Sequence, residues 1–123
     1  MTIADTDALI DYLAGKGEAE GVERLLRRGA LQTTVITRFE LLSGARNPKQ
    51  LARLVQLLGA IPSLTLDDAA ADAASEIRKS LDQSGKSIGM ADSLIAGIVI
   101  SNGGSLMTRN RRHFERIPGL ALA

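Results

Sequence analysis

Three acidic residues, Asp5, Glu40 and Asp92, stand in similar local settings far apart in the chain. Asp5 and Glu40 follow short apolar or β-branched runs, and Asp92 lies inside an apolar stretch. A charged carboxylate in apolar surroundings is unfavourable unless something pairs with it. If these segments are neighbours in a parallel sheet, the acids meet at the edge where such sheets bind their ligands. Converging carboxylates repel one another and favour a hard cation such as Mg²⁺.

Each acid alone also has a structural explanation. Asp5 can cap the helix that follows it, since Asp is a favoured N-cap residue. The segment from Thr37 to Glu40 matches a capping box, in which the glutamate reaches back to the first helical amide. Asp92 would gain from a helix dipole, but the dipole does not explain its place on a stripe of buried residues. A shared site explains the three acids together better than three separate structural roles do.

A fourth region whose side chains could take part in chemistry follows the apolar residues 105–107. Thr108 and Asn110 offer neutral oxygens to a metal ion or to its water molecules. Three arginines of this region are suited to holding phosphates: Arg109, Arg111 and Arg112. The structural alternative is a solvated loop in which Asn110 caps a short helical turn. His113 is the only histidine, and we assign it no role, because a lone histidine is more often a surface or packed residue.

Size and composition fit one cytoplasmic domain spanning residues 1–123. Hydrophobic residues make up 45% of the chain, but no apolar run reaches the ~18 residues that span a bilayer. The N-terminus lacks the basic and apolar regions of a signal peptide. The absence of cysteine excludes disulfides and thiolate metal sites and fits a cytoplasmic protein. With a net charge of +1, no field of the whole protein attracts nucleic acid, so any such attraction must come from a local patch. With 2% aromatic residues, stacking of nucleic-acid bases on aromatic platforms is not expected.

The order of the expected elements indicates the fold class. Helices are expected at residues 8–13, 19–28, 37–45, from 47 onward, 67–83 and 91–101. Strands are expected at residues 2–4, 31–35, 61–66, 105–107 and 120–122, and Pro62 makes the third of these an edge strand. Alternation of strands with helices predicts an α/β fold with a mainly parallel sheet.

Four segments, in order, resemble PIN domains and specifically the VapC toxins of bacterial toxin–antitoxin pairs. They are residues 3–11, 37–44, 85–96 and 108–114, which together span essentially the whole chain. Each motif alone is weak, but four in order are specific. The resemblance implies a five-stranded sheet of order 3-2-1-4-5 flanked by helices.

The resemblance also implies an activity, a site and partners. Family members are metal-dependent endoribonucleases, usually homodimeric, and a small antitoxin silences them by inserting its tail into the active-site groove. The family's three acids match Asp5, Glu40 and Asp92, with Thr6 as the neighbouring hydroxyl. These acids are expected to be catalytic and to hold Mg²⁺ or Mn²⁺, partly through water, while Thr108 and Asn110 support them.

The match departs from the family at one place. Where many PIN domains carry a fourth acid, this chain has Asn110, with His113 at a later position that is commonly Asp, so the family's full four-acid, two-metal site is incomplete here. Asp7 either adds charge to the site or only favours the first helical turn. The alternative function is a degenerate PIN scaffold that only binds partners. The Asp5-Thr6-Asp7 motif also resembles that of haloacid-dehalogenase phosphatases, but their motif lysine and later acidic pair are missing.

Overall fold

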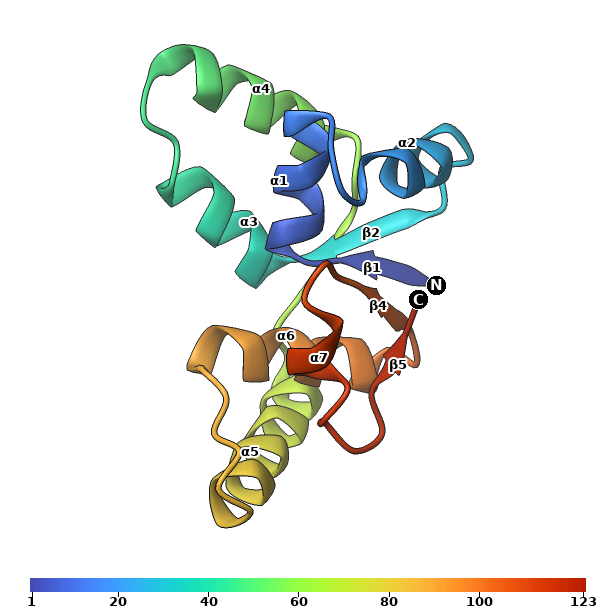
Figure 1. Ribbon diagram of the computed structural model, residues 1–123. Helices are drawn as coiled ribbons and strands as arrows, with labels where there is room; N and C mark the ends of the chain where they lie inside the picture. Colours follow the sequence, from blue (N-terminus) through green and yellow to red (C-terminus); the bar gives the residue numbers. More distant parts are fainter.

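A five-stranded parallel sheet forms the centre of the computed structural model, which describes residues 1–123 (Figure 1). The strands lie in the order β3-β2-β1-β4-β5, and every neighbouring pair is parallel. They are β1 (Thr2–Ala4), β2 (Leu31–Thr34), β3 (Ser63–Leu64), β4 (Ser105–Met107) and β5 (Ala121–Leu122). The predicted α/β class and the predicted strand order are both confirmed.

Helices cover both faces of this sheet. In Figure 1, α1 (Thr6–Ala14), α2 (Ala19–Arg27), α3 (Val35–Ser43) and α4 (Pro48–Gly59) lie above it. Below it lie α5 (Asp68–Gln83), α6 (Met90–Ser101) and α7 (Arg111–Phe114). Successive strand residues point to opposite faces, so Ile3 packs into the lower hydrophobic core and Ala4 into the upper one.

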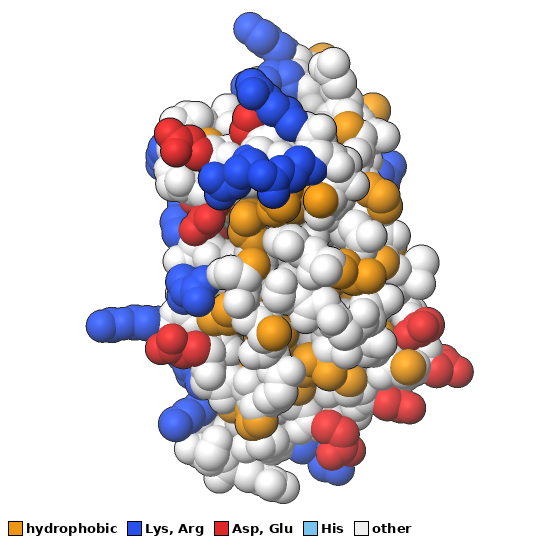
Figure 2. Space-filling view, turned by 90° about the vertical axis from the view of Figure 1, so that its right-hand side faces the viewer, with side chains coloured by type: hydrophobic (Ala, Val, Ile, Leu, Met, Phe, Trp, Pro, Cys, Tyr) orange, Lys and Arg blue, Asp and Glu red, His pale blue; other side chains and the backbone are white.

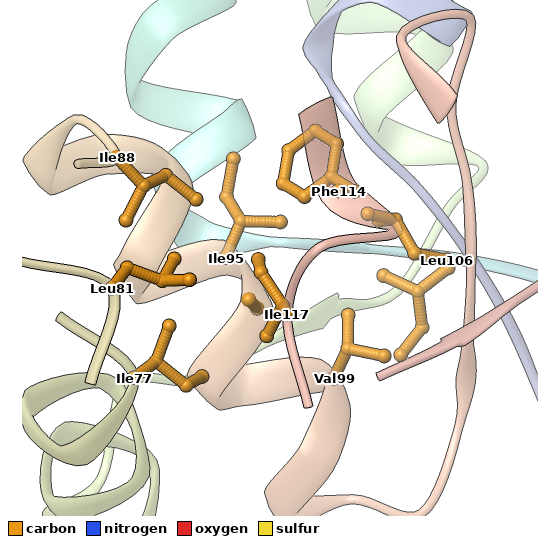
Figure 3. Close-up of a cluster of buried hydrophobic side chains, with 10 residues drawn as sticks. Ile77, Leu81, Ile88, Ile95, Val99, Leu106, Phe114 and Ile117 are labelled. Carbon is orange, nitrogen blue, oxygen red and sulfur yellow. The ribbon is translucent and has the colours of Figure 1, made fainter. Parts of the chain in front are cut away.

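The lower core fixes the helix that carries Asp92. Side chains from α5, α6, β4 and α7 converge there, with Ile95 of α6 close to Phe114 of α7 (Figure 3). Gly97 allows α6 to lie close against α5, because a Cβ at this position would be 2.5 Å from the carbonyl oxygen of Ala70. The N-terminal turn of α6 is thereby held at the edge of the sheet.

Three predicted helix ends differ from the structure by two residues: the start of α1 and both ends of α3, which ends at Ser43 rather than Ala45. The two starts concern residues near the site. The first helix begins at Thr6 rather than Ala8, because Asp5 is its N-cap. Helix α3 begins at Val35 rather than Thr37, and Thr34 is its N-cap, with its hydroxyl accepting from the amide of Thr37 at 3.1 Å. The predicted capping box is therefore wrong. The third strand is at the edge, as predicted, but only two residues pair. The short α7 is the helical turn that the sequence offered only as the structural alternative.

The surface has an uneven charge distribution despite the low net charge. On the face shown in Figure 2, Lys and Arg side chains gather at the upper end, and the hydrophobic side chains are scattered. Three arginines line a cavity of about 520 Å³ with two glutamates between α1 and α2: Arg24, Arg27 and Arg28. None of the helices has the length and apolar character needed to cross a membrane.

Candidate active site

The three predicted acids line one cavity at the carboxyl edge of the sheet. Its volume is about 190 Å³, and its walls come from the start of α1, from α3, from the first turn of α6 and from the segment after β4. The lining residues are Asp5, Thr6, Asp7, Glu40, Asp92, Ile95, Asn110 and Phe114. The fold thus brings together residues that are up to 109 positions apart (Asp5 to Phe114).

Asp5 has both of the roles that the sequence allows, because it caps α1 and also lines the cavity. Its backbone amide donates to the carbonyl of Met107 at 3.1 Å, which fixes it beside the end of β4. Its Oδ1 accepts from the amide of Ala8 at 2.9 Å and so caps α1. The residue is only 4% exposed and still lines the cavity, so capping does not remove it from the site.

Burial raises the pKa of Asp5 from its ordinary value of 3.8 to about 6. The Thr108 hydroxyl and the Ala8 amide lower this pKa, while the charges of Asp7 and Asp92 raise it further. A buried carboxylate beside two like charges lacks a compensating cation. Asp7 therefore contributes charge to the site in addition to lying in the first turn of α1.

Glu40 is oriented by a hydroxyl of the neighbouring helix. Oγ1 of Thr6 donates to Oε1 of Glu40 at 2.6 Å and lies 3.2 Å from Oγ1 of Thr37. Because α3 begins at Val35, Glu40 lies in its second turn, where its side chain cannot cap the helix. Thr6 thereby links the first acid segment to the second.

Asp92 has a partner that reasoning from the sequence missed. Its side chain is 38% exposed in the first turn of α6, and its Oδ2 lies 2.9 Å from Nε2 of His113 on α7. The only signal in the sequence is the alignment of His113 with a position that is commonly acidic in PIN domains.

The segment after β4 forms one wall of the site. Thr108 is 1% exposed and its hydroxyl accepts from the amide of Asn110 at 3.0 Å. Asn110 lines the cavity and its side chain makes no capping hydrogen bond to α7. The structural alternative is therefore borne out in part: Asn110 is the N-cap residue of α7, and its carbonyl accepts from the amides of His113 and Phe114, but its side chain does not cap the turn.

The three arginines of this segment point to different partners. Arg109 forms ion pairs with Asp11 at 2.7 Å and Asp7 at 3.4 Å. Arg111 donates to the carbonyl of Ala123 at 2.6 Å, and the exposed Arg112 forms no ion pair. The buried Asp11, with 1% of its side chain exposed, was not foreseen from the sequence. Arg109 thus ties the site segment to α1 instead of standing free in solvent.

The donor set of the cavity fits a hard divalent cation. Its lining residues include four carboxylates and one amide but no Lys, Arg or His. Oxygen donors of this kind are the ligands that Mg²⁺ and Mn²⁺ prefer. No three acidic or histidine side chains are close enough to hold one ion directly, so water molecules have to complete the coordination, as Mg²⁺ commonly requires.

Comparisons with known proteins agree with this fold and site. The model of the PIN domain matches residues 2–120, and the chain belongs to the PIN domain family. It is 32% identical over 120 residues to a protein named tRNA(fMet)-specific endonuclease VapC from Shigella flexneri, covering 94% of this chain and 91% of that one. It is 31% identical over 116 residues to Ribonuclease VapC11 of Mycobacterium tuberculosis, with coverage of 89% and 87%.

A solved structure of a relative has the same fold. The crystal structure of DNA-bound VapBC from Salmonella typhimurium superposes with a TM-score of 0.85 at 29% identity, covering 99% of this chain and 96% of that chain.

Proposed function

We propose that this protein is a metal-dependent endoribonuclease and the toxin of a toxin–antitoxin pair. The observation that carries the proposal is the convergence of Asp5, Glu40 and Asp92 on one small cavity without a basic side chain. Relatives named as VapC endonucleases and ribonucleases support the reaction class. A relative solved as a VapBC complex supports the partner.

Each residue of the cavity has a distinct task in this proposal. Asp5, Glu40 and Asp92 hold Mg²⁺ or Mn²⁺, partly through water. When bound, such an ion activates a water molecule and stabilises the charge that develops on the scissile phosphate. Thr6 orients Glu40 through its hydrogen bond, and the pair Thr108 and Asn110 orders the polar groups on the opposite wall.

We propose that the arginines near the cavity bind the RNA substrate. Arg112 and Arg111 are exposed and suited to phosphate contacts. Arg109 is 49% exposed, so it can reach a phosphate while its ion pairs hold the segment. Because relatives are named for tRNA(fMet), this tRNA is the first RNA to test.

The antitoxin is proposed to bind in an apolar groove that continues from the site. This groove has a volume of about 400 Å³ and shares Thr6 and Glu40 with the acidic cavity. Its apolar walls come from α1, α3 and α4 and include Ile10, which is 43% exposed. An apolar antitoxin segment that ends in a basic side chain would fill the groove and neutralise the acids. Ile10→Asp should then weaken co-purification of the antitoxin without removing nuclease activity.

Homodimerisation is part of the same proposal. Phe39 and Met90, at 69% and 64% exposed, are the most exposed of the large apolar side chains, and we propose that they lie in the interface between the two subunits. Light scattering after size-exclusion chromatography should give a dimer mass for the wild type and a smaller mass for Phe39→Ser.

The activity is tested by RNA cleavage with purified protein. Cleavage should require Mg²⁺ or Mn²⁺ and stop in EDTA, and Asp92→Asn should lose activity by orders of magnitude. Expression of the wild type in bacteria should arrest growth, and expression of Asp92→Asn should not. Binding of the antitoxin without any cleavage would instead favour the degenerate scaffold.

A further inference from the structure

The contact between His113 and Asp92 joins two elements at the edge of the cavity. Nε2 of His113, on α7, lies 2.9 Å from Oδ2 of Asp92, on α6. Their side chains are 23% and 38% exposed, so both are partly shielded from water. An ionised carboxylate can only accept, and Nε2 therefore carries the hydrogen and donates it.

The three acids of the site are held in a common way. One oxygen of Asp5 accepts from the Ala8 amide, one oxygen of Glu40 accepts from the Thr6 hydroxyl, and one oxygen of Asp92 accepts from His113. Oδ1 of Asp92 forms no hydrogen bond within the protein. Each acid thus accepts at least one hydrogen bond that orients it, and the orientation of Asp92 depends on a single imidazole.

We propose that His113 is the positioning residue of Asp92, and this inference rests on the metal-dependent function proposed above. His113 does not line the cavity, whereas Asp92 does, so the imidazole acts through the carboxylate and not on the cation. By holding Oδ2, it restricts the rotation of the carboxylate and leaves Oδ1 available for the ion. Hydrogen-bond partners of metal-binding carboxylates typically change metal affinity by ~10–100-fold when they are removed.

Calorimetric titration of the metal-free full-length protein with Mn²⁺ and with Mg²⁺, at one fixed pH, tests the inference. His113→Ala should weaken both ions by ~10–100-fold. His113→Gln should restore most of the affinity, because the glutamine amide can place an N–H near the position of Nε2. Glu115→Gln, at the exposed end of the same helix, is the control and should bind both ions within ~2-fold of the wild type.

Three results would overturn the inference. Wild-type affinity in His113→Ala would mean that the contact has no effect on the site. Equal weakness of His113→Gln and His113→Ala would exclude the donated hydrogen bond as the cause. Loss of Mn²⁺ binding with Mg²⁺ binding intact would make His113 a direct nitrogen ligand, since imidazole prefers transition metals.

The same titration distinguishes a failure of the proposed function from a failure of the inference about His113. If the wild type binds neither ion, or if Asp92→Asn binds as well as the wild type, the metal site itself is wrong and the role of His113 falls with it. If the wild type binds and Asp92→Asn does not, while His113→Ala binds normally, only the inference about His113 fails.

Discussion

Replacing Asp5 with Asn should stabilise the metal-free protein at neutral pH. Asn retains the capping of α1, because it is as good an N-cap residue as Asp. It also removes a charge that is buried beside Asp7 and Asp92. The substitution therefore isolates the electrostatic strain of the acidic cavity from the structure of the helix that begins there.

The magnitude follows from the pKa of Asp5. This pKa is raised from 3.8 to about 6, and each pKa unit corresponds to about 1.4 kcal/mol, so the ionised carboxylate destabilises the folded state by about 3 kcal/mol. Because the pKa is higher in the folded state, the folded protein binds more protons between these two pH values. The stabilisation from the protonated form is complete below about pH 4 and is lost as pH rises through about 6.

Urea denaturation in EDTA at about pH 4, near the lower of the two pKa values, and at about pH 7.5, above the higher one, measures this effect. The two proteins should differ little at the lower pH. At the higher pH, Asp5→Asn should be more stable by about 3 kcal/mol, or roughly 10 °C in Tm. Added Mg²⁺ should stabilise the wild type and much less the variant, since ligand binding favours the folded state by mass action.

Asp72→Asn is the control, because Asp72 is an exposed acid in the middle of α5. It should differ from the wild type equally at both pH values. If the stability difference between Asp5→Asn and the wild type is the same at both pH values, Asp5 is not strained. If Asp5→Asn is less stable at pH 7.5, capping by the charged side chain outweighs the repulsion, and the electrostatic account of the cavity is refuted.

Three further predictions concern packing, the ion pair at the site and metal stoichiometry. Gly97→Ala should lose about 2–3 kcal/mol in urea denaturation, because its Cβ would meet a carbonyl of α5, whereas Gly59→Ala, with open space around it, should not lose stability. Arg109→Ala should lose about 2–3 kcal/mol by leaving a buried aspartate of α1 unpaired, and Arg112→Ala should melt like the wild type. Asn110→Asp should bind a second Mn²⁺ more tightly in calorimetry and need less Mg²⁺ for half-maximal cleavage; unchanged stoichiometry and affinity would place residue 110 outside the metal site.

The fold and the three acids could be predicted from the sequence, because both depend on local patterns of residues. Short β-branched runs alternate with helical periodicity, which is sufficient for a parallel α/β sheet. The carboxyl ends of such strands share one edge, and Asp5 directly follows β1. Glu40 and Asp92 are further from their strands, but the expected convergence of acids at one sheet edge already groups them with Asp5, and the family resemblance supports the same grouping.

The errors in the boundaries of α3 arise because tertiary contacts determine where β2 ends and α3 begins. Thr34 and Thr37 are both acceptable caps for α3, and pairing of Thr34 with Leu64 of β3 decides where β2 ends. The strand therefore ends at Thr34 rather than at the predicted Val35, and the helix starts directly after it. No local pattern contains this information.

The missed contacts join residues that are distant in the sequence. Asp11 pairs with Arg109 across 98 positions, and Asp92 meets His113 across 21 positions. A buried carboxylate and a lone histidine have no periodic signature, so only the packing of α1 and α6 against the segment after β4 reveals their partners. The grouping of the three arginines was likewise a matter of sequence proximity, and their side chains diverge.

The central claim is that the acidic cavity uses a divalent cation to direct water at an RNA phosphodiester. RNA cleavage in ¹⁸O-labelled water, followed by mass spectrometry of the product ends, tests it most directly. The account predicts one ¹⁸O atom in the new terminal phosphate, cleavage that stops in EDTA, and no product from Asp92→Asn. Cleavage in EDTA, or products that end in an unlabelled 2′,3′-cyclic phosphate, would contradict the account, because the RNA's own hydroxyl would then be the nucleophile.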